Sequence, residues 1–235
     1  MKRWIKRLAK ETVFKITRTK QHLKRSINCE HEWYGSEYGG FYVCPSLLNS
    51  QSVVYSFGVG EDISFDKSII EKHQCKVYAF DPTPKSIKWV KQQLKPNKFS
   101  FYNFGISKKT SEVDFYLPKN PDFVSGSEVE HINISPERRV RVSMKCLKDI
   151  IKELGHKKID LLKMDIEGSE YEVLDNILKE KIPVKQILVE FHDRFFKRGD
   201  EKSAKTVENL YENGYEIFAL SDSFDEVSFL NTQEA

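Results

Sequence analysis

The chain has 235 residues, of which 39% are hydrophobic and 31% charged, so it can bury a substantial core and is not a wholly disordered chain. The formal net charge of +3 is too small to indicate nucleic-acid binding by itself. No apolar run approaches the roughly 18 residues that a membrane span requires.

The first 25 residues form a basic segment. They hold ten lysine and arginine side chains against one acidic side chain, Glu11, and Trp4 and Leu8 share one side at helical spacing. We therefore predict a basic helical extension over residues 1–34. Three roles are open to it: a solvated helix packed on the domain, a helix that lies on an anionic membrane through residues 1–25, or, least favoured, a nucleic-acid contact.

Cysteine usage and the start of the chain point to the cytoplasm. Cys29, Cys44, Cys75 and Cys146 are scattered and form no CxxC pair, which predicts thiols in a reducing compartment and no zinc site. The basic start is not followed by an apolar h-region, so we expect no secretory signal. The predicted location is cytoplasmic, with peripheral membrane contact as the alternative.

Residues 35–235 are predicted to form one α/β domain in which strands and helices alternate. The expected strands are 53–57, 76–80, 99–104, 112–117, 140–144, 159–164 and 187–191, and the expected helices are 63–73, 84–94, 147–154, 169–179 and 203–213. Residues 118–136 are too long for an ordinary connection and are predicted to be a lid or substrate loop. Residues 215–220 and 226–230 close the chain as an antiparallel pair. This order predicts a Rossmann-like, mostly parallel sheet covered on both faces, and the final strand pair is typical of class I methyltransferases.

Features that follow the first two strands predict a nucleoside-containing ligand. Gly58 and Gly60 come directly after the strand at 53–57, where they let the backbone approach a ligand and turn into a helix. Asp81 ends the next strand, about 20 residues after Gly60, where a carboxylate can accept hydrogen bonds from ribose hydroxyls. A glycine pair alone would fit any tight turn, but the combination indicates a nucleoside.

The charge beside the glycine turn favours S-adenosylmethionine over a dinucleotide. Glu61 and Asp62 stand where a pyrophosphate would lie, so they would repel an anion and attract a sulfonium or an α-amino group. Ile63 occupies the position of the third glycine that a dinucleotide site needs. Asp62 could instead only cap the helix, which would suit either ligand.

Two later strand ends carry candidate catalytic side chains. Asp165 and Glu167 follow the strand at 159–164, where charged groups are costly unless they are paired or solvated in a cleft. Glu190 and His192 end another strand, and a histidine of near-neutral pKa could accept a proton from a substrate hydroxyl. His192 could equally be a loop histidine with satisfied hydrogen bonds. We expect no metal, although Asp165, Glu190 and His192 have the chemistry to hold a divalent one.

The segment LLKMDIEGSE at residues 161–170 resembles the signature of the FkbM-type methyltransferase family. The resemblance covers roughly residues 35–230, through these further segments: VYSFGVGED (54–62), FDP (80–82), FYN (101–103), IS (106–107) and LVEFH (188–192). It implies a Rossmann-like fold, S-adenosylmethionine as methyl donor and, usually, O-methylation of sugars or secondary metabolites. It also implies that Gly58, Gly60 and Asp81 hold the cofactor. Asp165 and Glu167 are implied to flank the donor methyl group.

The glycine turn departs from the family pattern. The family usually has an aspartate before the turn and a glycine that closes it, where this chain has Ser56 and Asp62. We therefore include Ser56, Glu61 and Asp62 among the predicted cofactor-binding residues, with Glu61 or Asp62 taking over the α-amino group. Asp165, beside the donor methyl group, is also a predicted cofactor-binding residue.

These observations together predict an S-adenosylmethionine-dependent methyltransferase that methylates a hydroxyl of a sugar, glycan or secondary metabolite. Asp165, His192 and Glu167 are the predicted catalytic residues, and the partner is a small-molecule or glycan acceptor rather than nucleic acid. One alternative is a catalytically silent binding protein with a cofactor fold, and a weaker one is an NAD-dependent oxidoreductase. The sequence predicts no particular oligomeric state.

Overall fold

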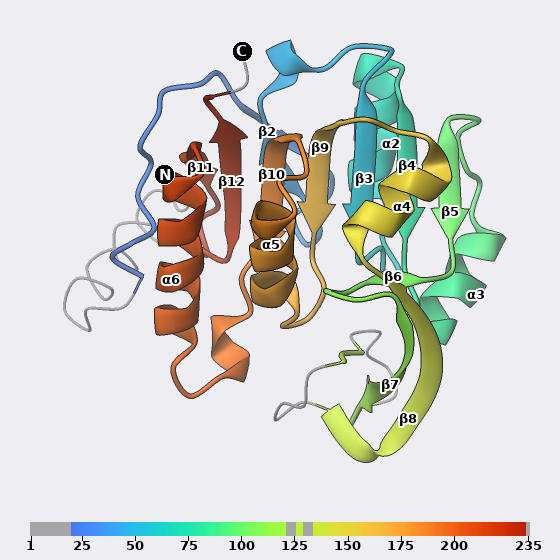
Figure 1. Cartoon of the computed structure of the whole chain (residues 1–235). Coiled ribbons are helices and arrows are strands. Elements are labelled where there is room, and N and C mark those ends of the chain that lie inside the picture. The colour runs from blue at the N-terminus through green and yellow to red at the C-terminus, as the bar shows by residue number, and fades with distance from the viewer. Residues whose placement is uncertain (1–19, 121–125, 129–133, 234–235) are drawn as a thin grey trace.

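The computed structural model describes residues 20–120, 126–128 and 134–233, in which a seven-stranded sheet forms the centre of the molecule (Figure 1). The strand order is β11-β12-β10-β9-β3-β4-β5. Their bounds are β3 (Val53–Phe57), β4 (Lys76–Phe80), β5 (Phe99–Tyr102), β9 (Ile159–Met164), β10 (Val184–Glu190), β11 (Tyr215–Leu220) and β12 (Glu226–Asn231). β12 runs antiparallel to both β10 and β11, whereas β10, β9, β3, β4 and β5 pair in parallel. The predicted Rossmann-like class I methyltransferase fold with a C-terminal antiparallel pair is confirmed.

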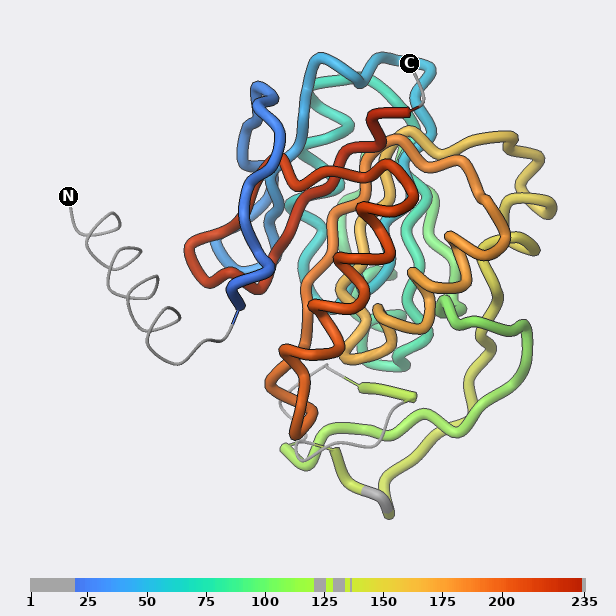
Figure 2. The backbone as a smooth tube through the Cα atoms, turned by 60° about the vertical axis from the view of Figure 1, so that its left-hand side comes forward, coloured from blue at the N-terminus to red at the C-terminus, as the bar shows by residue number. Residues whose placement is uncertain are grey.

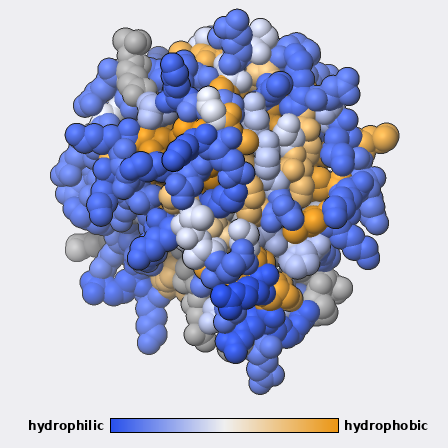
Figure 3. Space-filling model, turned by 45° about the vertical axis from the view of Figure 1, so that its right-hand side comes forward, coloured by the Kyte–Doolittle hydropathy of each residue, from blue (hydrophilic) through white to orange (hydrophobic). Residues whose placement is uncertain are grey.

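Helices cover both faces of this sheet, as runs of consecutive apolar residues in its central strands require. On β9, Leu162 packs into the core beneath α4 (Leu147–Leu154), α5 (Glu170–Lys179) and α6 (Gly199–Glu212), while its neighbour Leu161 packs on the opposite side. That opposite face is covered by α2 (Ser64–His73) and α3 (Pro84–Gln92). The surface that faces the viewer in Figure 3 is mostly hydrophilic, with hydrophobic side chains visible in patches between polar ones.

The strand order reverses between β3 and β9, so the crevice expected to bind ligands lies where these two strands end. Gly58 follows β3 with a φ of +78°, and a Cβ atom there would come within 1.6 Å of the carbonyl oxygen of Asp165. Only glycine allows the two chain segments to approach this closely. The close approach joins the glycine turn to the segment that carries Asp165.

A second, three-stranded sheet lies beyond the carboxyl ends of the central strands (Figures 1 and 2). It consists of β6 (Gly105–Ile106), β8 (Ile134–Lys145) and β7 (Ser111–Pro118). β8 is much longer than the strand predicted at 140–144, because it stays paired with β7 as far as Ile134. The predicted lid at 118–136 is therefore partly strand, and its residues 121–125 and 129–133 lie outside the described residues.

Residues 20–34 pack against the domain, which corrects the predicted boundary between a helical extension at 1–34 and a domain at 35–235. The side chain of Leu23 is buried, and the backbone amide of Ser26 donates to the carbonyl oxygen of Ile217 at 2.8 Å. β1 (Glu32–Tyr34) forms an antiparallel hairpin with β2 (Phe41–Val43), and the segment runs beside the C-terminal strands in Figure 2. Residues 1–19, where most of the predicted helix falls, lie outside the described residues. The described part has no helix long and apolar enough to cross a membrane.

The cysteines differ from the prediction of four thiols. Cys29 and Cys44 form a disulfide that ties the segment before β1 to the residue after β2, just ahead of the short helix η1 (Pro45–Leu47). Cys75 and Cys146 are free. The 15-residue separation of Cys29 and Cys44 carries no pairing signal, because the hairpin is what brings them together. A structural disulfide is typical of oxidising compartments, so it argues against the predicted cytoplasmic location, which stays untested.

Candidate active site

A cavity of about 290 Å³ opens at the carboxyl ends of β3, β4 and β9. Its walls include the glycine turn at residues 58–60, Asp81, and the acidic residues Asp165 and Glu167. The second sheet contributes an apolar part of the wall that includes Phe115. The structure thus brings two of the predicted catalytic residues and all of the predicted cofactor residues except Ser56 to one cavity.

Asp81 shapes the glycine turn. Its side chain is buried, with Oδ2 accepting a hydrogen bond from the amide of Gly60 and Oδ1 accepting one from the amide of Thr83, both at 2.8 Å. Burial raises the pKa of this carboxyl, although these backbone bonds oppose the rise. A carboxylate oxygen can accept more than one hydrogen bond, so the side chain can also accept one from a ligand in the cavity.

The two acidic residues after the turn, Asp62 and Glu61, make different interactions. Asp62 precedes the N-cap residue of α2, and its Oδ1 accepts from the amide of Ser64, the first residue of that helix, at 2.7 Å. Oδ2 accepts from the hydroxyl of Ser36 at 2.6 Å. Burial alone would raise the pKa of Asp62, but these hydrogen bonds lower it. Glu61 is exposed and lies 3.6 Å from the ammonium of Lys85. Both carboxylates line the cavity, so the hydrogen bond of Asp62 at the start of α2 is compatible with the predicted ligand role.

Ser56 is not among the residues that line the cavity. It is buried in β3 and hydrogen-bonds Asp66, which does line the cavity from α2. Burial raises the pKa of Asp66 to about 6, with Lys163 and Ser56 opposing the rise. Lys163, another buried cavity residue, donates to the carbonyl oxygen of Gly58 at 2.7 Å. Any effect of Ser56 on a ligand therefore acts through Asp66.

Sequence reasoning missed Asp66, although a signal for it existed. Asp66 precedes Ile69 and Ile70 by three and four residues, which places it on the same buried face of α2. A carboxylate on an otherwise apolar helix face is costly to bury and is therefore a candidate for a site.

The loop after β9 is held in shape by Glu170, a second residue that sequence reasoning missed. Its carboxylate is fully buried and accepts from the amides of Ile166 at 3.1 Å and Gly168 at 3.0 Å. Glu167 and Gly168 both have positive φ values, of 55° and 106°. The hydroxyl of Ser127 also donates to the carbonyl oxygen of Glu167 at 2.7 Å. Glu170 stands in the first turn of α5, where the sequence alone could not distinguish it from an ordinary helix-start acid.

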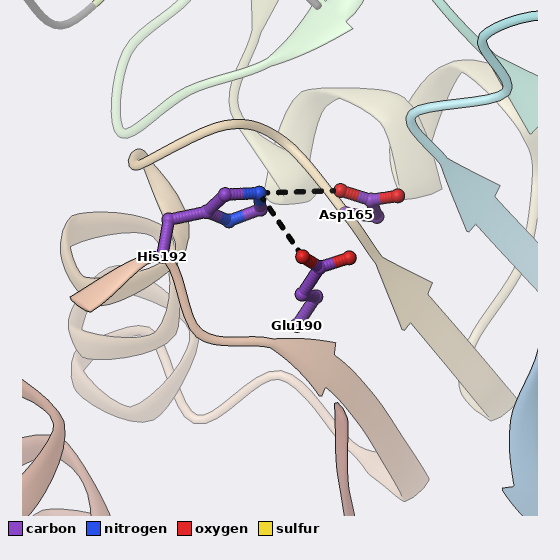
Figure 4. A group of neighbouring side chains, drawn as sticks. All are labelled: Asp165, Glu190 and His192. Atoms are coloured by element: carbon purple, nitrogen blue, oxygen red, sulfur yellow. Dashed lines mark ion pairs between the residues drawn. The ribbon is translucent and has the colours of Figure 1, made fainter. Parts of the chain in front are cut away.

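His192 joins this loop to the end of β10, just before the short helix η2 (Asp193–Phe195). Its ring is 1% exposed, and Nδ1 lies 2.8 Å from Glu170 Oε1. The other ring nitrogen, Nε2, faces Glu190 Oε1 at 3.5 Å and Asp165 Oδ1 at 3.6 Å (Figure 4). A third carboxylate oxygen, Glu167 Oε2, lies 3.3 Å from Nε2. The four residues at the two strand ends are thus neighbours, as the topology predicted, but His192 lies behind Asp165 and Glu167 and is not a cavity-lining residue.

The electrostatics of this cluster differ from the expectation for a general base. Burial alone would lower the pKa of His192, but the charges of Glu170, Glu190 and Asp165 outweigh it and raise the pKa to about 10. A histidine with that pKa is already protonated at neutral pH, so the prediction of a near-neutral base is wrong for His192 in this arrangement. Burial and the neighbouring charge of Asp165 raise the pKa of Glu190 to about 8.

Comparison with known proteins gives matches to methyltransferases. Residues 53–217, most of the chain, match the family described as the methyltransferase FkbM domain. The chain is 27% identical over 154 residues to the probable methyltransferase-like protein 24 of Homo sapiens, a match that covers 65% of this chain and 36% of that protein. The protein of the same name from Rattus norvegicus is 25% identical over 154 residues, with the same coverage. The match thus spans about a third of the length of these relatives.

Among solved structures, the chain resembles a methyltransferase FkbM from Methylobacillus flagellatus KT. The TM-score is 0.49 at 14% identity, and the superposition covers 78% of this chain and 44% of that one.

Proposed function

The chain belongs to the FkbM methyltransferase domain family, and from this premise we propose that it is an S-adenosylmethionine-dependent methyltransferase that methylates a hydroxyl of a small-molecule or glycan acceptor. One observation carries the proposal. A single cavity at the reversal of strand order is lined both by the glycine turn with Asp81 and by the acidic pair Asp165 and Glu167. A donor and an acceptor can therefore meet in it.

The wall near β3 and β4 suits S-adenosylmethionine. Asp81 is already fixed by two backbone bonds and can accept further bonds from ribose hydroxyls. Glu61 and Asp62 place negative charge beside the turn, which would attract the α-amino group or sulfonium of the donor and would repel a pyrophosphate. This distribution of charge favours the proposal over the dinucleotide alternative.

The wall near β9 suits a hydroxyl acceptor. Asp165 and Glu167 can accept hydrogen bonds from substrate hydroxyls, whereas they would repel the phosphates of a nucleic acid. Phe115 from the second sheet offers an apolar surface against which a sugar ring or an aliphatic metabolite can pack. A polyhydroxylated, uncharged acceptor fits this combination.

The reaction is an in-line displacement. The acceptor oxygen attacks the methyl carbon, the bond from sulfur to that carbon breaks with its electron pair going to sulfur, and S-adenosylhomocysteine leaves as a neutral thioether. The hydroxyl proton passes to the Asp165–Glu167 pair, and His192 holds these carboxylates in position. Because the sulfonium is a good leaving group, alignment and exclusion of water supply much of the acceleration.

The experiment that tests the donor site is a calorimetric titration of the purified chain with S-adenosylhomocysteine, with NAD as comparator. We expect micromolar binding of the thioether and none of NAD. Asp81→Asn keeps the size of the side chain but removes its charge, and should weaken binding at least about tenfold, which corresponds to about 1.4 kcal/mol. Thermal unfolding of the variant checks that the glycine turn survives.

Two outcomes would contradict the proposal. Binding of NAD in preference to the thioether would favour the oxidoreductase. Binding of S-adenosylhomocysteine without any measurable release of methyl groups from the donor, across hydroxylated acceptors, would favour the catalytically silent binding protein.

A further inference from the structure

The cluster around His192 contains more acidic groups than basic ones. Four carboxylates lie within 3.6 Å of its ring nitrogens: Asp165, Glu167, Glu170 and Glu190. Their side chains are at most 25% exposed. Against them stand the imidazole and Arg194, which is half exposed and donates to Glu190 Oε1 at 3.0 Å. When all four acids are ionised, the protonated imidazole and Arg194 offset only two of the four negative charges. Burying the remaining negative charge away from water is energetically costly.

The Nε2 atom of His192 is the second observation. It is buried and has no hydrogen-bond partner among the described residues. Nδ1 lies 2.8 Å from Glu170 Oε1, and this oxygen also accepts from the backbone amide of Ile166, so Glu170 is the acceptor and Nδ1 is the donor. The ring is thereby oriented with Nε2 aimed between Asp165 and Glu190 (Figure 4).

We propose that Asp165, Glu190 and His192 bind one divalent metal cation. One oxygen from each carboxylate and one ring nitrogen of His192 all lie within 4.8 Å of one another, and Nε2 is the nitrogen that faces both carboxylates. The separations from Nε2, 3.6 Å to Asp165 and 3.5 Å to Glu190, are too long for good hydrogen bonds. They match atoms that share an ion, because two ligands about 2.0–2.2 Å from one metal at angles near 90–110° lie about 3 to 3.6 Å apart.

The surroundings of the three ligands also suit a metal. A ligating histidine commonly donates its other ring nitrogen to a carboxylate, and Glu170 already accepts from Nδ1 at 2.8 Å. Glu167 Oε2, at 3.3 Å from Nε2, is close enough to act as a further ligand or to hold a metal-bound water. One imidazole with two or three carboxylates favours Mn²⁺, Fe²⁺ or Zn²⁺ over Ca²⁺, which prefers oxygen ligands alone.

The role of the cation rests on the proposed function. Asp165 lines the cavity, so an ion bound to it would lie at the acceptor side. There it would act as a Lewis acid on the acceptor hydroxyl and lower the pKa of that group, while Glu167 receives the proton. The cation would replace the proton on Nε2, which is released to solvent, so His192 would then be a neutral metal ligand rather than a base.

The test is a calorimetric titration of the full chain, stripped with a chelator, with MnCl₂ and in parallel with ZnCl₂. We expect one Mn²⁺ or Zn²⁺ per chain with micromolar affinity, and a thermal unfolding midpoint that rises with metal concentration. Asp165→Asn, Glu190→Gln and His192→Gln should each weaken binding at least tenfold. Unfolding of each variant without metal establishes that it is folded.

Glu226→Gln is the matched control. Glu226 is the cross-strand partner of Glu190 on β12 and acts on its charge, but it offers no ligand to the three-residue cluster. This variant should bind Mn²⁺ as the native chain does. Weakening as large as that of Glu190→Gln would show diffuse attraction to an acidic surface and would overturn the site.

The metal site and the proposed function can fail separately. A native chain that binds S-adenosylhomocysteine but takes up neither Mn²⁺ nor Zn²⁺ at millimolar concentration would leave the function standing and refute the metal site. The cluster would then be an imidazolium bridging carboxylates. Stoichiometric metal binding without binding of S-adenosylhomocysteine would support the metal site and refute the donor site.

Discussion

Gly58 shows at the scale of one residue how the site depends on close contact. Its missing side chain allows the turn after β3 to lie against the carbonyl of Asp165, and that contact joins the donor wall of the cavity to the acidic wall. Gly60 has a similar backbone, with a φ of +57°, but has open space around the position of a Cβ atom. A side chain at Gly58 would therefore meet both a steric clash and backbone strain, whereas one at Gly60 would meet backbone strain alone.

Gly58→Ala should be far more damaging than Gly60→Ala. In Gly60→Ala only the left-handed backbone is strained, which costs about 1 to 2 kcal/mol, or roughly 2 to 8 °C in the unfolding midpoint. In Gly58→Ala the new methyl group would overlap backbone that cannot move away, so we expect either no folded protein or a loss of more than twice that size. Thermal unfolding of both variants measures the difference. Equal losses would show that the clash at Asp165 is relieved by a small shift.

Asp66 predicts a dependence of stability on pH. Its pKa is raised by burial from 3.8 to about 6, so the folded state holds the proton more tightly than the unfolded state does. The resulting stability is fully present below about pH 4 and is lost as the pH rises through about 6, by on the order of 3 kcal/mol. Asp66→Asn removes this loss.

The free energy of unfolding of the Asp66→Asn variant should therefore increase relative to that of the native chain as the pH rises. The difference in unfolding midpoint between variant and native chain should grow by roughly 4 to 8 °C from pH 4.5 to pH 7.5, because about 2 kcal/mol of the loss falls within this range. Glu71→Gln, an exposed acid on the same helix, is the control and should show no such growth. If the difference in unfolding midpoint between Asp66→Asn and the native chain does not change with pH, Lys163 keeps the Asp66 carboxylate ionised over the whole pH range.

At the scale of the elements, the sequence predicted most strands of the central sheet and most helices, but it did not predict the elements whose local pattern is weak. β3, β4, β9, α4 and β11 have the predicted bounds because each is a short apolar or amphipathic run that ends at a turn residue or a charge. The hairpin β1–β2 and the length of β8 were missed. β1 and β2 have three residues each, too few to show an alternating pattern, and the first residues of β8 are held by pairing with β7, of which the local pattern carries little trace.

The basic residues at the start of the chain carry an element prediction that the structure leaves open. We propose that residues 1–19, with seven lysine and arginine side chains and one glutamate, bring the protein to anionic membranes. The native chain should co-sediment with vesicles that contain anionic lipid but not with neutral vesicles, and high salt should release it. Removal of residues 1–19 should abolish co-sedimentation.

The truncation is placed before Lys20 for a structural reason. Leu23 is buried in the domain, so a deletion through residue 25 would also remove core contacts. The control is thermal unfolding of the truncated chain, whose midpoint should equal that of the native chain. Co-sedimentation that is unchanged by the deletion would favour the solvated helix.

At the scale of the whole molecule, the disulfide makes stability depend on redox conditions. Closing a loop of about 15 residues stabilises a fold by about 3 kcal/mol, so a reductant should lower the unfolding midpoint by roughly 6 to 12 °C. The double variant Cys29→Ser, Cys44→Ser should be insensitive to reductant. Thiol titration of the denatured chain should find two thiols, Cys75 and Cys146, before reduction. Four thiols in protein that was never reduced would restore the expectation of a reducing compartment.

Sequence pattern alone predicted the α/β class, the final antiparallel pair, and the presence of glycines and carboxylates at the strand ends, because hydrophobic period and turn residues are local properties. It also identified Asp165, Glu167 and His192 as one group, since parallel strands deliver their ends to one edge. Only the tertiary structure decided what that group is. The bond from Glu170 that turns the His192 ring, the burial that alters the pKa values, and the separations that fit a shared ion all depend on residues brought together from β9, α5 and β10. Distances and burial of this kind arise from packing between segments far apart in the chain, and no local pattern encodes them.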